Sequence, residues 1–226
     1  MRINEKYRPT SLSGIIGQNK AREYFLDLAT SPRSTCVMLE GPPGTGKTTM
    51  ALALANELGC TDEMHGRHKI NASELSVEAV AYYFGGLGKN GLLRYRSWAD
   101  SGFKVLIIEE LEWLHAQVQT KLKELLETER PPSTIIIATS NGAAKLQRAL
   151  LQRFDILYLN GGRQFADDCQ DRIAEAWDAE SGGRPLPPEW RAWGWFQDGL
   201  VKEFSLRQAL DDMLPALAEL KATAAA

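Results

Sequence analysis

A glycine-rich stretch at residues 41–49 carries the residue types that bind phosphate groups. It reads Gly-Pro-Pro-Gly-Thr-Gly-Lys-Thr-Thr, and the spacing Gly-x4-Gly-Lys-Thr is that of a phosphate-binding loop. Glycines let the backbone curl so that successive N–H groups point at phosphate oxygens. The Lys47 ammonium suits the outer phosphates, and the Thr48 hydroxyl is a ligand for Mg²⁺. The stretch therefore predicts nucleoside triphosphate binding by Pro43, Gly44, Thr45, Gly46, Lys47, Thr48 and Thr49.

The segments on either side of this loop favour a phosphate site over an ordinary glycine-rich turn. An apolar run at 36–39 predicts a strand before the loop, and residues 50–58 have the pattern of a helix after it. This order of strand, loop and helix is the context that the motif requires. The positive end of the helix adds to the favourable field for an anion.

Two adjacent carboxylates follow a second apolar run. Residues 103–108 predict a buried strand that ends in Glu109 and Glu110. Side chains alternate along a strand, so the two carboxylates should point in different directions. Beside a phosphate loop, we expect Glu109 with Thr48 to hold Mg²⁺ and Glu110 to orient the attacking water. The weaker alternative is a pair of acids that only caps a strand at the surface.

The remaining elements surround this expected site. Residues 134–139 and 155–159 predict two more strands, and the first of these ends at Ser140 and Asn141. Asn141 could reach the terminal phosphate or the lytic water, or belong to a simple turn. Residues 5–9 look polar and extended, residues 19–29 helical, and Ser73 could cap a helix that continues to residue 84. Helices are also expected at 164–179 and 206–221.

Length and composition set the wider frame. The chain has 226 residues, a formal charge of −3 and 44% hydrophobic residues, which fits a globular protein with a real core. The sequence pattern changes near residues 161–162 from strands alternating with helices to helices alone. This change predicts an α/β domain at 1–161 and a small helical lid domain at 162–226. Three cysteines without a Cys-x-x-Cys pair suit reduced thiols. No apolar run approaches the ~18 residues of a membrane span, so we expect a cytoplasmic protein.

Two further features leave their interpretation open. Lys89, Arg94 and Arg96 lie in or after a glycine-rich loop, where they could touch a polyanion or simply face solvent. Trp190, Trp193 and Trp195 more readily fill a core than stack on bases.

Taken together, the motifs resemble an AAA+ ATPase of the clamp-loader clade, similar to replication factor C small subunits. Residues 5–9 with 16–18 match the nucleotide-base-binding stretch of that family, and residues 71–74, Asn-Ala-Ser-Glu, resemble its Asn-Ala-Ser-Asp. Glu109 and Glu110 stand in the Walker B place and Asn141 in the sensor 1 place. Arg153 matches the arginine of the Ser-Arg-Cys motif, and residues 205–210 resemble the sensor 2 helix with Arg207.

The resemblance implies an α/β P-loop NTPase fold of the AAA+ type, a parallel sheet flanked by helices, with ATP and Mg²⁺ as cofactors. It assigns Tyr7, Arg8, Ile16, Gly17 and Arg207 to nucleotide binding. It implies catalytic roles for Lys47, Glu109, Glu110, Asn141 and Arg153, with Arg153 reaching the nucleotide of a neighbouring subunit in a homo- or hetero-oligomer. DNA, a replication or recombination protein such as a sliding clamp, and no membrane are the implied partners.

The sequence departs from that family in three places. Glu109 replaces the usual aspartate, which shifts the expected magnesium position and predicts slow hydrolysis. Phe154 replaces a cysteine, which we interpret as a packing change. The residues after the sensor 2 helix supply no helical collar, so a complete loader subunit is not expected. Two other functions stay open, namely a helicase or remodelling motor and a nucleotide-dependent scaffold that does not hydrolyse ATP.

Overall fold

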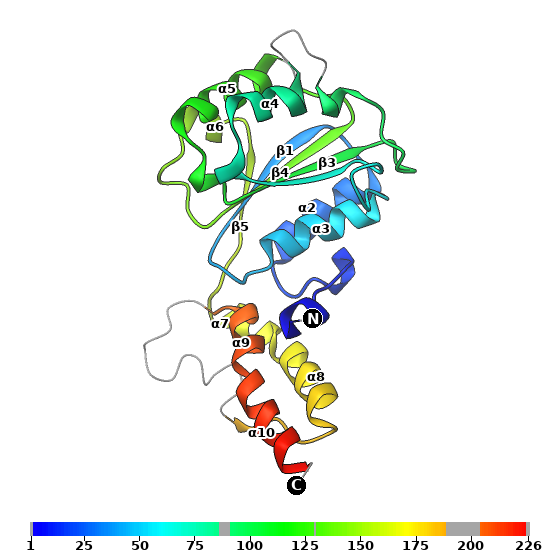
Figure 1. The fold of residues 1–226 in the computed structure, drawn as a ribbon, viewed down its shortest axis with the longest axis vertical. Coiled ribbons are helices and arrows are strands. Elements are labelled where there is room, and N and C mark those ends of the chain that lie inside the picture. The colour runs from blue at the N-terminus through cyan, green and yellow to red at the C-terminus, as the bar shows by residue number, and fades with distance from the viewer. Residues whose placement is uncertain (1, 86–90, 129, 189–203, 225–226) are drawn as a thin grey trace.

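The computed structural model describes residues 2–85, 91–128, 130–188 and 204–224 (Figure 1). Lys89 and the three tryptophans at 190, 193 and 195 lie outside these residues. The described part of the chain forms a parallel sheet covered by helices on both faces, followed by a group of C-terminal helices. The predicted α/β fold class is therefore confirmed.

The sheet has five strands in the order β2-β3-β4-β1-β5, and every pair of neighbours runs parallel. Its strands are β1 (Thr35–Glu40), β2 (Arg67–Asn71), β3 (Lys104–Glu109), β4 (Thr134–Ser140) and β5 (Asp155–Tyr158). The three central strands are almost wholly buried, which matches their continuous aliphatic sequences. The edge strands β2 and β5 are more exposed and more polar.

Alternate residues of the central strands pack against different helices. One face, which includes Val37 and Ile107, packs on α2 (Asn19–Thr30) and α3 (Lys47–Glu57). The opposite face, which includes Met38 and Ile108, packs on three helices: α4 (Val77–Phe84), α5 (Ala116–Thr128) and α6 (Arg148–Leu151). Figure 1 shows the two layers of helices with the sheet between them. Parallel strands covered on both faces bring all their carboxyl ends to one edge of the sheet.

The C-terminal helices form a separate core, and we call them the lid. They are α7 (Arg163–Asp168), α8 (Gln170–Ser181), α9 (Leu206–Asp212) and α10 (Leu214–Ala224). Phe165, Trp177 and Phe204 are buried among them. The predicted single helix at 206–221 is divided at Met213. Pro215 explains the division, because it has no N–H to donate and is accommodated only in a first helical turn.

Residues 3–6 at the N-terminus pack on the lid rather than on the sheet. The predicted extended conformation of residues 5–9 is partly wrong, because α1 (Ile3–Lys6) is a short helix. Ile3 belongs to the lid core, and the Asn4 amide donates to both carboxylate oxygens of Asp211 at 2.8 and 2.7 Å. Lys6 pairs with Glu180 of α8 at 2.6 Å. These contacts to distant residues favour the helical turn.

The predicted helix cap at Ser73 is also wrong. The Asn71 side chain accepts a hydrogen bond from the Ser73 N–H at 3.0 Å and so begins a short 3₁₀ helix, Ala72–Glu74. The helix α4 starts later, where the Ser76 hydroxyl accepts from the Ala79 N–H at 3.1 Å. Both serines have suitable chemistry, but Ser73 lies inside the 3₁₀ helix, so Ser76 is the residue that caps α4. The predicted helix at 164–179 is likewise divided, at Cys169.

The chemistry of the cysteines agrees with their burial. All three are buried free thiols, and burial raises the pKa of Cys36 and of Cys60 to about 11 and that of Cys169 to about 12. They are therefore poor nucleophiles near neutral pH. Across the described ranges, no helix is both long enough and apolar enough to cross a bilayer.

The lid meets the sheet and its helices at the phosphate loop. Gly161 accepts a backbone hydrogen bond from the Phe204 N–H at 2.5 Å. Gly44 has a φ of +80°, and a Cβ added there would overlap the Ser205 side chain, which caps α9. Gly46 has a φ of +93°, but a Cβ there would meet nothing within 4 Å. Of these two loop glycines, Gly44 is therefore the one that allows close contact with the lid.

This difference gives a matched pair of variants. Gly46→Ala should lower the free energy of unfolding by about 1–2 kcal/mol, the cost of a left-handed alanine. Gly44→Ala should lower it by roughly 1–3 kcal/mol more, because its methyl group also displaces the start of α9. Thermal and urea unfolding without nucleotide would measure both. Equal losses in the two variants would contradict the close packing of loop and lid.

Candidate nucleotide-binding site

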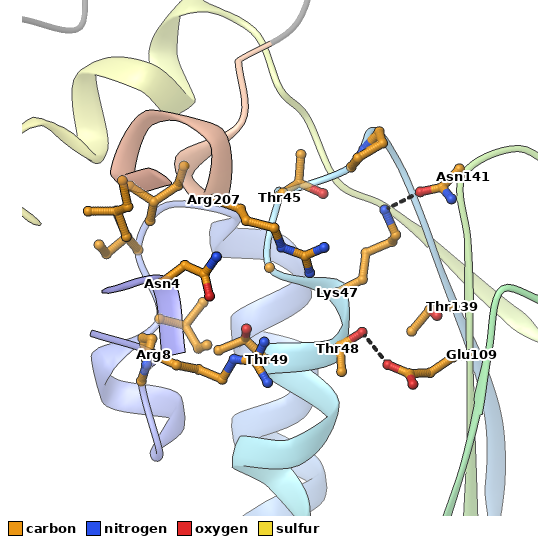
Figure 2. Close-up of a pocket in the computed structure, with 18 of the residues that line it drawn as sticks. Asn4, Arg8, Thr45, Lys47, Thr48, Thr49, Glu109, Thr139, Asn141 and Arg207 are labelled. Atoms are coloured by element: carbon orange, nitrogen blue, oxygen red, sulfur yellow. Dashed lines mark hydrogen bonds between the residues drawn. The ribbon is translucent and has the colours of Figure 1, made fainter. Parts of the chain in front are cut away.

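A cavity of about 370 Å³ opens at the carboxyl edge of the sheet, between the start of α3, the N-terminal segment and α9. Figure 2 shows most of the residues that line it. Most of the predicted site residues are among them: Tyr7, Arg8, Ile16, Pro43, Gly44, Thr45, Gly46, Lys47, Thr48, Thr49, Glu109, Glu110, Asn141 and Arg207. Gly17 and Arg153 do not line it.

The phosphate loop joins β1 to α3 through a tightly curled backbone. Gly44 and Gly46 take positive φ angles, and a Cβ at Gly41 would overlap the Leu159 carbonyl oxygen. The helix α3 begins at Lys47, and its N-cap Gly46 has no side chain to occupy the first-turn N–H groups. These N–H groups and the positive end of an 11-residue helix form a cradle that suits phosphate oxygens.

Lys47 connects the loop to the end of β4. Its ammonium donates to the carbonyl oxygens of Gly41 and Pro42 at 2.6 and 2.8 Å, and to Asn141 Oδ1 at 3.0 Å. Figure 2 shows the Lys47–Asn141 contact across the cavity. Two predicted residues that are far apart in sequence therefore meet directly.

Thr48 and Glu109 form the pair expected for a metal. The Thr48 hydroxyl donates to Glu109 Oε1 at 2.8 Å, as Figure 2 shows. The other carboxylate oxygen, Oε2, accepts from the ammonium of Lys69 at 2.8 Å. A hydroxyl and a carboxylate beside a phosphate cradle are hard oxygen ligands, so this pair fits Mg²⁺.

Glu110 follows the last residue of β3, and its backbone is no longer extended. Its φ of 57° and ψ of 49° are left-handed, which is uncommon for a residue with a side chain and concentrates at functional sites. Its N–H donates to Thr139 Oγ1 at 3.3 Å, and its Oε2 accepts from Asn71 Nδ2 at 3.0 Å. The carboxylates of Glu109 and Glu110 thus have different partners.

Glu112 is a site residue that the motifs did not indicate. Its Oε1 accepts from both the backbone N–H and the side-chain amide of Asn141, at 3.2 and 2.8 Å. Its Oε2 is buried and accepts no hydrogen bond within the described part of the chain. Because the amide donates to Glu112, its oxygen faces Lys47. The one sequence signal was a third acid two residues after Glu110.

The wall opposite the carboxylates is formed by the N-terminal segment, α7 and α9. Its apolar lining includes Phe165, Leu206 and Leu210, which suits the flat faces of a nucleobase. Tyr7 donates to Glu180 at 3.3 Å, and burial raises the pKa of this tyrosine. The guanidinium groups of Arg8 and Arg207 both point toward the first turn of α3 (Figure 2).

The two predicted residues outside the cavity have other surroundings. Gly17, with a φ of +58°, packs where a Cβ would crowd Asp168 and Phe165 of α7. Arg153 Nη2 pairs with Glu127 Oε2 of α5 at 2.8 Å, and this hydrogen bond lowers the pKa of the Glu127 carboxyl. Arg153 therefore faces the helical layer around α5 and is not directed at its own phosphate loop.

The basic residues near the glycine-rich loop also lie away from the cavity. Arg94 donates through Nε to the Phe84 carbonyl oxygen at 3.1 Å, and the Arg96 side chain is exposed. Neither lines the cavity.

The Glu112 contact gives a prediction. Glu112→Ala removes the acceptor that orients Asn141, and misplacement of a polar group by about 1 Å costs roughly 100-fold in rate. We expect ATP turnover to fall by about 10- to 100-fold, with nucleotide affinity little changed. Glu112→Gln keeps an acceptor oxygen and should retain more activity, while Glu124→Ala, at an exposed position on α5, is the control. A large loss of nucleotide affinity in Glu112→Ala would contradict this role.

Comparison with known proteins agrees with the geometry. Residues 37–161 match the ATPase family associated with various cellular activities (AAA). The replication factor C large subunit of Halorubrum lacusprofundi is 28% identical over 199 residues, which cover 76% of this chain and 39% of that protein. The small subunit of Thermofilum pendens is 30% identical over 150 residues, covering 66% of this chain and 44% of that protein. This chain thus spans less than half the length of either relative.

A solved structure shares the fold. The RuvB Holliday junction branch migration motor of Thermotoga maritima aligns with a TM-score of 0.55 and 26% identity, over 76% of this chain and 55% of that one. The family match covers more than half of this chain and contains the phosphate loop, Glu109, Glu110 and Asn141. The chain belongs to the AAA family of ATPases and is related to replication factor C subunits.

Proposed function

We propose that this chain binds and hydrolyses ATP with Mg²⁺ as a subunit of an oligomeric, clamp-loader-like switch that acts on DNA in replication or recombination. The observation that carries this proposal is the convergence of separate segments on one cavity. The N-terminal segment, the phosphate loop, the ends of β2, β3 and β4, and α9 all contribute side chains to it. Such convergence of glycine backbone, lysine, hydroxyl and carboxylates is what phosphoryl transfer requires.

Within this proposal the residues divide the work. The N–H groups of the phosphate loop and Lys47 bind the phosphates, and Thr48 with Glu109 holds Mg²⁺, which neutralises charge on the phosphate oxygens. Glu110 orients the attacking water, and Asn71 and Thr139 fix the position of Glu110 through their hydrogen bonds. Tyr7, Arg8 and Ile16 border the base and sugar, and Arg207 contacts the phosphates from the lid.

Arg153 supplies the argument for an oligomer. It does not line the cavity of its own chain, and it pairs with Glu127 on α5. An arginine that contacts the transferring phosphoryl group accelerates hydrolysis by ~10³–10⁵. We therefore assign Arg153 to the site of a neighbouring subunit. A sliding clamp or another replication or recombination protein is the proposed partner, and a cytoplasmic location stays a prediction.

Two observations favour second candidates. The RuvB structure, which is that of a Holliday junction branch migration motor, favours a related DNA motor. Glu109 in place of aspartate, with one oxygen paired to Lys69, favours a scaffold that assembles on nucleotide and turns over slowly. We rank the clamp-loader-like switch first because replication factor C subunits are the matched relatives in sequence.

The first test separates these candidates. We expect wild-type ATP hydrolysis to increase when primed DNA is added, and Lys47→Ala to lose nucleotide binding because it removes the phosphate-facing cation. Steady-state hydrolysis with and without primed DNA, together with fluorescent-nucleotide binding, measures both. Nucleotide-driven assembly without turnover would instead indicate the scaffold, and strand unwinding by this chain would indicate the motor.

The second test concerns Arg153. Arg153→Ala should retain nucleotide binding and lose most hydrolysis, whereas Arg148→Ala, an exposed arginine on α6, should behave as wild type. Mixing Arg153→Ala with Glu110→Gln should restore part of the activity, because each Arg153→Ala site then receives the arginine of a Glu110→Gln neighbour. Full activity of Arg153→Ala alone, or no recovery in the mixture, would contradict a shared site.

A further inference from the structure

Lys69 on the edge strand β2 is a cation that the nucleotide motifs do not include. Its ammonium lies 2.8 Å from Glu109 Oε2. Lys69 itself does not line the nucleotide cavity and instead borders a neighbouring groove with Arg8 and Arg67. Lys69 therefore contacts the Glu109 carboxylate from outside the cavity in which a nucleotide would lie.

The register of the sheet explains this approach. Lys69 pairs with Ile107 and Asn71 with Glu109 across the parallel ladder of β2 and β3. Residues two apart on a strand share a face, so Lys69 and Asn71 both project on the side of α3. Asn71 contacts Glu110 and Lys69 contacts Glu109. One edge strand thus holds both carboxylates of the site.

Both oxygens of Glu109 are already in use. Oε1 accepts from the Thr48 hydroxyl and Oε2 from the Lys69 ammonium, each at 2.8 Å. Two donors on opposite oxygens fix the plane of the carboxylate. The ammonium also offsets the negative charge that would attract a divalent cation, and it repels a second cation close to Glu109.

We propose that Lys69 is a positioning residue that orients Glu109 and weakens its attraction for Mg²⁺. A higher Mg²⁺ concentration is then needed to form the metal–nucleotide complex than would be needed without Lys69. This inference rests on the proposed nucleotide site. Lys69 retains 45% of its side-chain exposure and Glu109 21%, so solvent screens the pair and the effect is modest. Glutamate is one methylene longer than aspartate, and Glu109 at this position has a second partner, Lys69, outside the cavity.

The test measures metal dependence and not turnover. The 226-residue chain is titrated with MgCl₂ at a fixed concentration of a fluorescent, non-hydrolysable ATP analogue, and the Mg²⁺ midpoint of binding is recorded. Lys69→Met should lower this midpoint by about three- to tenfold, because it removes the competing positive charge. Lys69→Arg keeps the charge and should stay within about twofold of wild type.

Two controls connect the effect to Glu109. Lys20→Met changes the net charge equally at an exposed position on α2 and should leave the midpoint unchanged. In a Glu109→Gln background, Lys69→Met should have no further effect, because the carboxylate on which it acts is gone. Circular dichroism of each variant verifies folding.

The contrary outcomes are separate from those of the proposed function. An unchanged or raised midpoint in Lys69→Met would overturn the inference, and so would an equal decrease in the Glu109→Gln background. In either case wild type would still bind the analogue. Failure of wild type to bind the analogue at any Mg²⁺ concentration would instead overturn the nucleotide site itself.

Discussion

The rest of the structure depends on close backbone packing around the phosphate loop. Gly41 lies against the Leu159 carbonyl oxygen after β5, and Gly44 lies against Ser205 at the start of α9. Neither position has room for a Cβ, so the residue after β5 and the start of α9 both pack closely against the loop. The loop is therefore a junction between two cores as well as a cradle for phosphate. Its shape is set by packing on both sides, which limits rearrangement when an anion binds.

Around this junction, three polar residues of the site contact side chains that lie outside the phosphate loop. Asn71 and Thr139 hold Glu110, Glu112 holds Asn141, and Lys69 holds Glu109. Such supporting contacts fix orientation before a ligand arrives, and preorganised dipoles avoid reorganisation during reaction. The left-handed backbone of Glu110 belongs to the same arrangement, because the Thr139 hydroxyl accepts its N–H.

The elements that local sequence patterns determine were predicted correctly. The central strands are continuous aliphatic runs, and the loop motif has fixed spacing, so β1, β3, β4 and the start of α3 followed from the residues alone. Sequence reasoning failed where distant contacts decide. The helix α1 forms because Ile3 and Asn4 contact the lid, and the cap at Ser76 depends on the turn begun by Asn71. Glu112 and Lys69 belong to no recognised motif. Only the fold brings Glu112 into contact with Asn141 and Lys69 into contact with Glu109.

The attachment of α1 to the lid has a mechanical consequence. Asn4 is bound to Asp211 on α9 and Lys6 to Glu180 on α8, while Tyr7 and Arg8 follow directly in the chain and border the cavity. Because of these contacts, a rotation of the lid would move residues 3–8 together with it. The cavity walls formed by residues 7–8 and by α9 would then move together relative to the phosphate loop.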